Sequence, residues 1–111
     1  MANTYLTKDA KKLLYILYKE YLNRRKHNVA KTRATDFDSA SSVQFNFMPN
    51  ELLEDVEEYM RELGRNDFLE NFYADDTIYS CYLTDYAICT METLPKDTLV
   101  SVANFISQFL T

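Results

Sequence analysis

Glycine and proline are scarce in this chain of 111 residues, which contains one Gly and two Pro. Turns with positive φ draw heavily on glycine, so this scarcity argues against a many-stranded sandwich or barrel and favours helices. No run of about 18 apolar residues occurs either, so we expect no membrane-spanning helix. The single Gly also excludes a glycine-rich phosphate-binding loop.

Cysteine and histidine are almost as rare, with two Cys and one His. Cys81 and Cys89 are too few for a disulfide framework, and with His27 they make no metal-ligand set. The first residues lack the basic start and apolar stretch of a secretory signal, so we expect a reducing, cytoplasmic location with both thiols buried as small hydrophobes. A nucleophile–base pair would need His27, which has no carboxylate beside it in sequence. We therefore expect no enzyme, metal, cofactor or small-molecule ligand.

The residues that are plentiful are those that build a core. Hydrophobic residues make up 47% of the chain, including seven Phe and nine Tyr. A chain of this length forms one core in most proteins, since single domains typically have roughly 100–150 residues. No repeat, low-complexity tract or linker interrupts the sequence. We therefore expect one domain over residues 1–111.

A long helix after Thr7 is the clearest predicted element. Thr7 is a suitable N-cap, and Asp9 in the first turn complements the exposed amide groups. Apolar residues then recur at helical spacing and form one wide stripe: Ala10, Leu13, Leu14, Leu17, Tyr18, Tyr21 and Leu22. The helix leads into the basic segment 23–28, whose cations favour the negative end of the helix dipole.

The segment that follows has a weaker pattern. Residues 31–38 predict a short helix, and residues 39–42 predict a break. Beyond the break, Val43, Phe45 and Phe47 alternate with polar residues, which is typical of a strand or an extended segment.

A strongly acidic helix is predicted over residues 50–63. Pro49 opens it, and Gly64 occupies the position after it where a left-handed residue is favoured. Its apolar residues are expected to face inward: Leu52, Leu53, Val56, Tyr59, Met60 and Leu63. Its polar positions hold Arg61 and six acids, namely Glu51, Glu54, Asp55, Glu57, Glu58 and Glu62. Phosphate groups would repel a surface of that sign.

A β-hairpin is predicted next, because residues 68–73 and 77–83 are rich in aromatic and β-branched residues. Residues 74–76 between them form a plausible turn. Thr84 is a suitable cap for a further helix that ends near Met91. This hairpin is the only one that the sequence predicts.

A final helix is predicted over residues 96–110, with an apolar face wider than about 100°. We expect this helix either to pack on the first helix or to form a homodimer through Leu99, Val102, Phe105, Ile106 and Phe109. Both arrangements would bury the face, and the pattern does not choose between them.

This order of elements resembles a winged helix-turn-helix domain. The match is best over residues 48–93, where the motifs read Leu63…Phe68-Leu69, Leu83-Thr84-Asp85-Tyr86-Ala87-Ile88 and Met91-Glu92. The segment is similar to the third helix, wing and following helix of small Gram-positive and phage-type winged-helix proteins, and in general plan to the YjcQ-type group. The chain departs from that pattern at Tyr86-Ala87, where the family commonly has Gly.

The resemblance implies an α+β fold that is mostly α. It would be winged-helix-like, with a three-helix core, one β-hairpin wing and an additional C-terminal helix. It also implies a role in transcription regulation, in which the helix at 50–63 would enter the major groove of DNA. Function does not follow from fold alone, so the surface chemistry has to be considered separately.

Charge is distributed very unevenly along the chain. Residues 1–33 hold nine of the twelve Lys and Arg and have a net charge of +7, whereas residues 34–111 have a net charge of −12. The basic end could contact a polyanion, or the two halves could simply attract each other.

Two functional hypotheses remain open. One is a homodimeric, DNA-associated regulator that contacts phosphates through the basic stretch Arg24, Arg25, Lys26, Lys31 and Arg33. The other is a protein–protein interaction module with no nucleic-acid role, which uses the acidic helix or the final helix.

Overall fold

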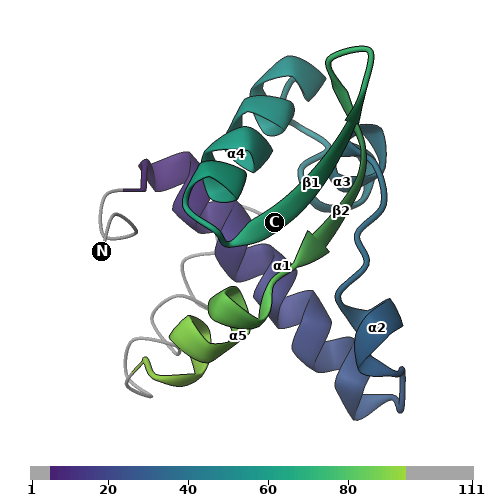
Figure 1. Cartoon of the computed structure of the whole chain (residues 1–111), viewed down its shortest axis with the longest axis vertical. Coiled ribbons are helices and arrows are strands. Elements are labelled where there is room, and N and C mark those ends of the chain that lie inside the picture. The colour runs from purple at the N-terminus through teal and green to yellow at the C-terminus, as the bar shows by residue number, and fades with distance from the viewer. Residues whose placement is uncertain (1–5, 95–111) are drawn as a thin grey trace.

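A computed structural model of the chain describes residues 6–94 (Figure 1). Within that range the elements are α1 (Lys8–Lys26), α2 (Lys31–Ala34), α3 (Ala40–Phe47), α4 (Leu53–Arg65), β1 (Leu69–Ala74), β2 (Thr77–Leu83) and α5 (Asp85–Glu92). The predicted α+β class with mostly helical content is confirmed. No helix in the described part is long and apolar enough to cross a membrane.

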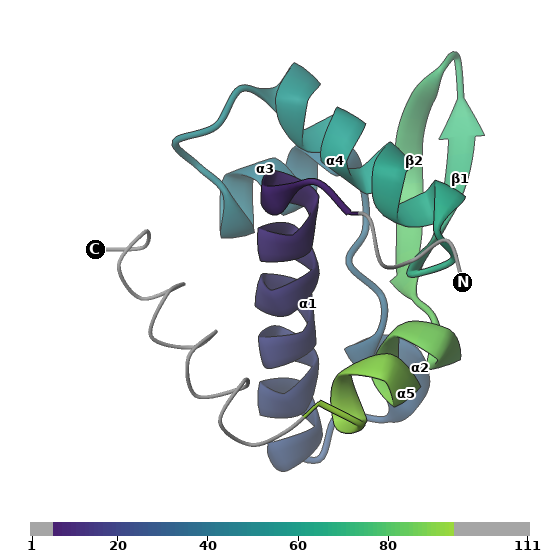
Figure 2. The same cartoon turned by 90° about the vertical axis from the view of Figure 1, so that its left-hand side faces the viewer.

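Helix α1 runs through the centre of the fold, with α3 and α4 packed near its N-terminal half and α2 and α5 near its C-terminal half (Figure 2). The hydroxyl oxygen of Thr7 accepts a hydrogen bond from the amide of Ala10 at 3.3 Å, so the predicted N-cap is confirmed. The stripe at helical spacing forms the middle of the core, and Leu13 and Leu17 are completely buried. Leu22, at the edge of the stripe, is 46% exposed.

The prediction of an extended segment at residues 43–47 is wrong, because these residues belong to α3. The hydroxyl of Ser39 accepts a hydrogen bond from the amide of Ser42 at 3.2 Å and caps this helix. Ala40 and Val43 are buried and Phe47 packs against the core, a spacing that suits a helix. The alternation of aromatic residues that suggested a strand leaves Phe45 on the surface.

The short helix expected over residues 31–38 ends early, at Ala34 in α2. The chain then runs extended beside the outer edge of β2. The amide of Phe37 donates to the carbonyl oxygen of Cys81 at 3.0 Å, and the amide of Leu83 donates to that of Thr35 at 2.9 Å. An isolated bridge joins Asp36 to Tyr82, so β2 has a hydrogen-bonded neighbour on both sides.

Helix α4 starts and ends later than predicted, and its glycine has another role. Pro49 does not open the helix, which begins at Leu53. Gly64 lies inside the helix and has no positive φ, whereas Asp67 takes the left-handed conformation with φ of 68°. A Cβ atom at Gly64 would lie 2.6 Å from Nδ2 of Asn71. Glycine at this position therefore lets α4 approach β1 without displacing the side chain of Asn71.

The predicted hairpin is confirmed as an antiparallel pair whose register runs from Leu69 opposite Leu83 to Ala74 opposite Thr77. Its turn has φ of 52° and 63°, both in the left-handed region, as a two-residue hairpin loop requires. All five positive-φ residues in the described part are Asn or Asp: Asn28, Asp38, Asp67, Asp75 and Asp76. Scarce glycine therefore does not prevent tight turns here, because Asn and Asp tolerate this conformation.

Helix α5 follows its predicted cap directly. The hydroxyl oxygen of Thr84 accepts a hydrogen bond from the amide of Ala87 at 3.0 Å and donates to the carbonyl oxygen of Asp67 at 2.7 Å. Cys81 is buried as expected, but Cys89 on α5 is exposed, so the expectation of two buried thiols is wrong for Cys89. The helix predicted at 96–110 lies outside the described residues, as do all five dimer-interface residues predicted on it.

Candidate functional site

Arg24, the first residue of the predicted phosphate-contacting stretch, is held by contacts inside the protein. Its Nε lies 2.9 Å from a carboxylate oxygen of Glu20, and its guanidinium carbon lies 4.6 Å from the ring centroid of Phe37. Its NH1 group also donates to the carbonyl oxygens of three residues, at 3.3, 3.4 and 2.8 Å: Arg33, Ala34 and Asp36. Arg24 therefore joins the C-terminal end of α1 to the α2 segment.

The other four cations of this stretch lie on the surface, and they differ in whether a carboxylate pairs with them. Lys31 forms an ion pair of 2.8 Å with Asp85 at the start of α5. This hydrogen bond, and then the charge of the carboxylate, raise the pKa of Lys31. Arg25 donates to the carbonyl oxygen of Val29 at 3.2 Å. Among the described residues, no carboxylate pairs with the exposed side chains of three residues: Arg25, Lys26 and Arg33.

This basic end lies far from the other surfaces that a winged helix would use on DNA. In both cartoon views, α2 and the C-terminal end of α1 lie at the opposite end of the molecule from the β1–β2 turn (Figures 1 and 2). The N-terminal end of α4 lies at the same end as that turn. The five predicted phosphate-contacting residues therefore cluster around the α1–α2 junction, away from the acidic helix.

The acids of α4 fall into two groups. Three of the carboxylates predicted on this helix have partners inside the protein. Glu62 accepts from the amide and hydroxyl of Thr7 at 2.6 and 2.7 Å. Glu57 accepts from the amide of Ile78 at 2.8 Å, and Glu51 accepts from the hydroxyl of Tyr59 at 3.0 Å. The remaining three are exposed: Glu54, Asp55, and Glu58, which lies 3.4 Å from Arg65.

Three exposed hydrophobic residues lie near these acids along the chain, on α3 and at the start of α4. They are Phe45, Leu52 and Leu53, which are 76%, 69% and 43% exposed, and we call this region the α3–α4 corner. The side-chain amide of Gln44 donates to the carbonyl oxygens of Pro49 and Glu51 at 3.4 and 3.1 Å, which holds the connecting loop against α3. The prediction that Leu52 and Leu53 face inward is therefore wrong. No sequence pattern indicates this corner, because a helix that starts at residue 50 directs both leucines inward.

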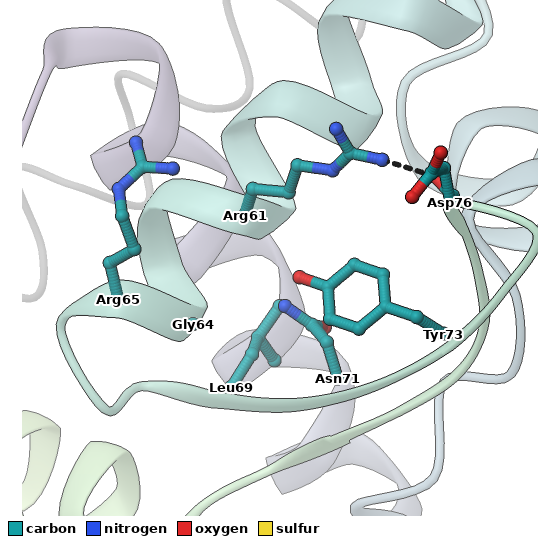
Figure 3. Close-up of a pocket in the computed structure, with 7 residues that line it drawn as sticks. All are labelled: Arg61, Gly64, Arg65, Leu69, Asn71, Tyr73 and Asp76. Atoms are coloured by element: carbon teal, nitrogen blue, oxygen red, sulfur yellow. Dashed lines mark hydrogen bonds between the residues drawn. The ribbon is translucent and has the colours of Figure 1, made fainter.

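A hollow lies between the C-terminal half of α4 and β1 (Figure 3). It is an open groove of about 500 Å³ lined by Arg61, Gly64, Arg65, Leu69, Asn71, Tyr73 and Asp76. Arg61 donates to the carbonyl oxygen of Asp76, and its guanidinium lies 5.7 Å from the ring centroid of Tyr73. The side-chain amide of Asn71 donates to the carbonyl oxygen of Met60 at 2.9 Å. Sequence reasoning missed this groove, although two arginines one helical turn apart in an acidic region were a usable signal.

Comparison of the chain with protein-family models, with curated proteins and with solved structures finds no match. Within residues 6–94, no three or more His, Cys, Asp or Glu side chains are grouped so that they could hold a metal ion. The resemblance to winged-helix proteins therefore stays a prediction, and function has to be argued from the surfaces of this chain.

Proposed function

We propose that this chain is a non-catalytic interaction module of winged-helix type that binds a cationic segment of a partner protein at the α3–α4 corner. The element order supports the winged-helix part of this proposal. Helices α1, α3 and α4 precede the hairpin, and the extended residues 35–37 pair with β2 on the side away from β1. On this assignment α3 and α4 form the helix-turn-helix pair, and the turn between them carries the exposed leucines.

The negative charge at the exposed start of α4 is the observation that favours a protein partner over DNA. Glu54, Asp55 and Glu58 are exposed on the helix that would have to enter the DNA groove, and Asp75 and Asp76 form the hairpin turn. DNA affinity depends on neutralising phosphates, so these carboxylates would oppose binding. The same carboxylates would attract Lys and Arg side chains of a protein.

The apolar part of the corner determines what else the partner must offer. Three large hydrophobic side chains are exposed within the nine residues from Phe45 to Leu53, and exposed apolar patches mark interaction sites. Burying the side chains of Phe45, Leu52 and Leu53 would supply binding free energy at about 25 cal/mol per Å² of apolar surface. We therefore expect a partner segment with apolar side chains flanked by Lys or Arg.

A DNA-associated regulator is the second candidate, and one observation favours it. Arg25, Lys26 and Arg33 are exposed and have no carboxylate partner among the described residues. They could contact phosphates as the sequence suggests. DNA would then be bound at the α1–α2 junction, and α4 would take no part in binding.

Titration of a fluorescently labelled amphipathic peptide of Leu and Lys, monitored by anisotropy, tests the first proposal. We expect binding that weakens at least tenfold, about 1.4 kcal/mol, in Glu54→Lys/Asp55→Lys. We expect a similar loss in Phe45→Ser/Leu52→Ser, whereas Lys19→Gln on the outer face of α1 is a charge-changing control that leaves binding unchanged. Equal peptide affinity in the wild type and in both double variants would contradict the proposal.

A further inference from the structure

The groove between α4 and β1 has a strand edge as one wall. The amide of Thr84 donates to the carbonyl oxygen of Phe68 at 3.2 Å, which makes these two residues a hydrogen-bonded pair of the ladder. Such pairs alternate along antiparallel strands, so Leu69 and Asn71 direct their backbone N–H and C=O groups away from β2. Within the described residues β2 is paired on both sides, whereas β1 pairs only with β2. Leu69 is 3% exposed and α4 covers the edge of β1 there, so the edge can accept another extended segment only from Asn71 onward.

The opposite wall of the groove is formed by α4 and carries positive charge, although this part of the chain is otherwise acidic. Arg61 and Arg65 are the two cationic residues of the segment 34–94, and both line this groove. They lie one turn apart on α4, at the spacing that places side chains on one helix face. In Figure 3 the Arg61 guanidinium group points toward Asp76, the Arg65 side chain lies apart from it along α4, and the ring of Tyr73 faces the helix from β1.

The ion pairs of these arginines with carboxylates are loose, although Arg61 is also held by the carbonyl oxygen of Asp76 and the ring of Tyr73. Arg61 lies 3.8 Å from Glu57, and Arg65 lies 3.4 Å from Glu58. Charge-assisted hydrogen bonds are roughly 2.7–2.9 Å long, and exposed ion pairs contribute little to stability. Glu57 also accepts the amide of Ile78 at 2.8 Å, so it keeps a partner if Arg61 moves. A carboxylate entering the groove can therefore pair with the exposed guanidinium group of Arg65, while Arg61 adds positive charge to the same wall.

Two further polar atoms in the groove walls lack partners among the described residues. The Nε–H of Arg61 has no acceptor, and the Oδ1 atom of Asn71 has no donor, although both are buried. A peptide group carries one donor and one acceptor, so a peptide backbone is a suitable partner for both atoms.

From these contacts we propose that the groove binds the C-terminal end of an extended peptide. The peptide backbone pairs with the outward-facing groups of Asn71 on β1, as in other cases of strand addition. Its terminal carboxylate is held by the guanidinium group of Arg65, and Arg61 adds positive charge to the same wall. This site is separate from the α3–α4 corner and does not depend on the function proposed there.

NMR titration of the ¹⁵N-labelled full chain tests the proposal, with N-acetyl-Val-Val bearing a free carboxylate as the probe. The invoked contacts involve only the peptide backbone and its terminus, so any short sequence serves. We expect saturable shifts of the amide signals of Asn71 and Tyr73 and of the Nε–H signal of Arg61. The C-terminally amidated peptide should bind at least about tenfold more weakly, because it lacks the charge that the arginines recognise.

Variants and a second ligand complete the test. Arg65→Gln, at an exposed position, should weaken binding of the free acid about tenfold and leave binding of the amide unchanged. Arg61→Lys keeps the charge but removes the Nε–H donor, so it should also weaken binding. Lys19→Gln is the matched control and should have no effect. The proposal is overturned by equal binding of acid and amide, by equal binding of acetate alone, or by shifts that never saturate.

Discussion

Substitution of Gly64 by Ala tests the close approach of α4 to β1, because two opposing effects can be compared. In a helix interior, Ala is more favourable than Gly by about 1 kcal/mol. Here the new Cβ atom would lie 2.6 Å from Nδ2 of Asn71 and 3.6 Å from its Cγ. The amide of Asn71 would have to leave the carbonyl oxygen of Met60, which it now meets at 2.9 Å. A buried donor without a partner costs about 1–3 kcal/mol.

The net effect of Gly64→Ala in the wild type should therefore be destabilising by about 1 kcal/mol. In an Asn71→Ala background the clash is absent, because the nearest remaining contact is the carbonyl oxygen of Leu69 at 3.8 Å. There Gly64→Ala should stabilise the fold by about 1 kcal/mol through its helix propensity alone.

Urea unfolding of the four proteins of this cycle, monitored by circular dichroism at 222 nm, measures both effects. The sign of the Gly64→Ala effect should reverse between the two backgrounds, with a coupling of about 1–3 kcal/mol. Equal stabilisation in both backgrounds would refute the reasoning, because it would mean that Gly64 and Asn71 do not meet.

Three further predictions concern other parts of the fold. Arg24→Ala should lower the free energy of unfolding by about 1–3 kcal/mol, because it removes charge-assisted hydrogen bonds to backbone carbonyl oxygens. Arg24→Lys should recover little of this loss, because Lys lacks the planar guanidinium group, and chemical denaturation measures both variants. Burial raises the pKa of the Cys81 thiol from 9.0 to about 12. Below pH 9 the thiol therefore keeps its proton in both the folded and the unfolded protein, whereas above pH 9 the unfolded chain loses this proton first. The free energy of unfolding should therefore fall with rising pH in this window, by up to about 1.4 kcal/mol per unit, and less steeply in Cys81→Ala; equal slopes in the two proteins would contradict this. If the final helix forms a homodimer, Phe105→Asp/Phe109→Asp should sediment as a monomer and the wild type as a dimer, whereas two identical monomers would remove the dimer.

The elements with strong local signals were predictable from the sequence. The stripe behind Thr7 and the cap at Thr84 combine regular spacing with a side chain that can satisfy backbone amides, and both were found where expected. The hairpin was also placed to within about a residue, because its strands are rich in β-branched and aromatic residues around a turn of acids.

The elements around α3 were not predictable, for reasons specific to their residues. The alternation at Val43, Phe45 and Phe47 satisfied the strand pattern, although the helical spacing from Ala40 decides the structure. Gly64 was expected to end α4 because glycine is the usual left-handed residue there. Asp67 provides that conformation instead, and glycine is kept for its lack of a Cβ. Such a contact between α4 and β1 is visible only when the two elements are placed together.

For the candidate surfaces, only the charges of the residues could be predicted from the sequence. The sequence located the acids of α4 and the cations of the basic stretch. It could not show that Arg24 pairs with Glu20 and donates hydrogen bonds to backbone carbonyl oxygens, or that Lys31 pairs with Asp85. Neither the α3–α4 corner nor the groove beside β1 was found, because both depend on how separate elements pack.

Binding of a labelled DNA duplex of about 20 base pairs at low salt, roughly 25 mM, tests most directly whether α4 serves a protein partner or DNA. We expect no saturable change in anisotropy with the wild-type protein, because exposed carboxylates at the N-terminal half of α4 and in the hairpin turn would repel phosphates. Tight binding that weakens steeply with salt, and that is lost in Arg25→Glu/Arg33→Glu, would contradict this expectation and assign the chain to DNA through the α1–α2 junction.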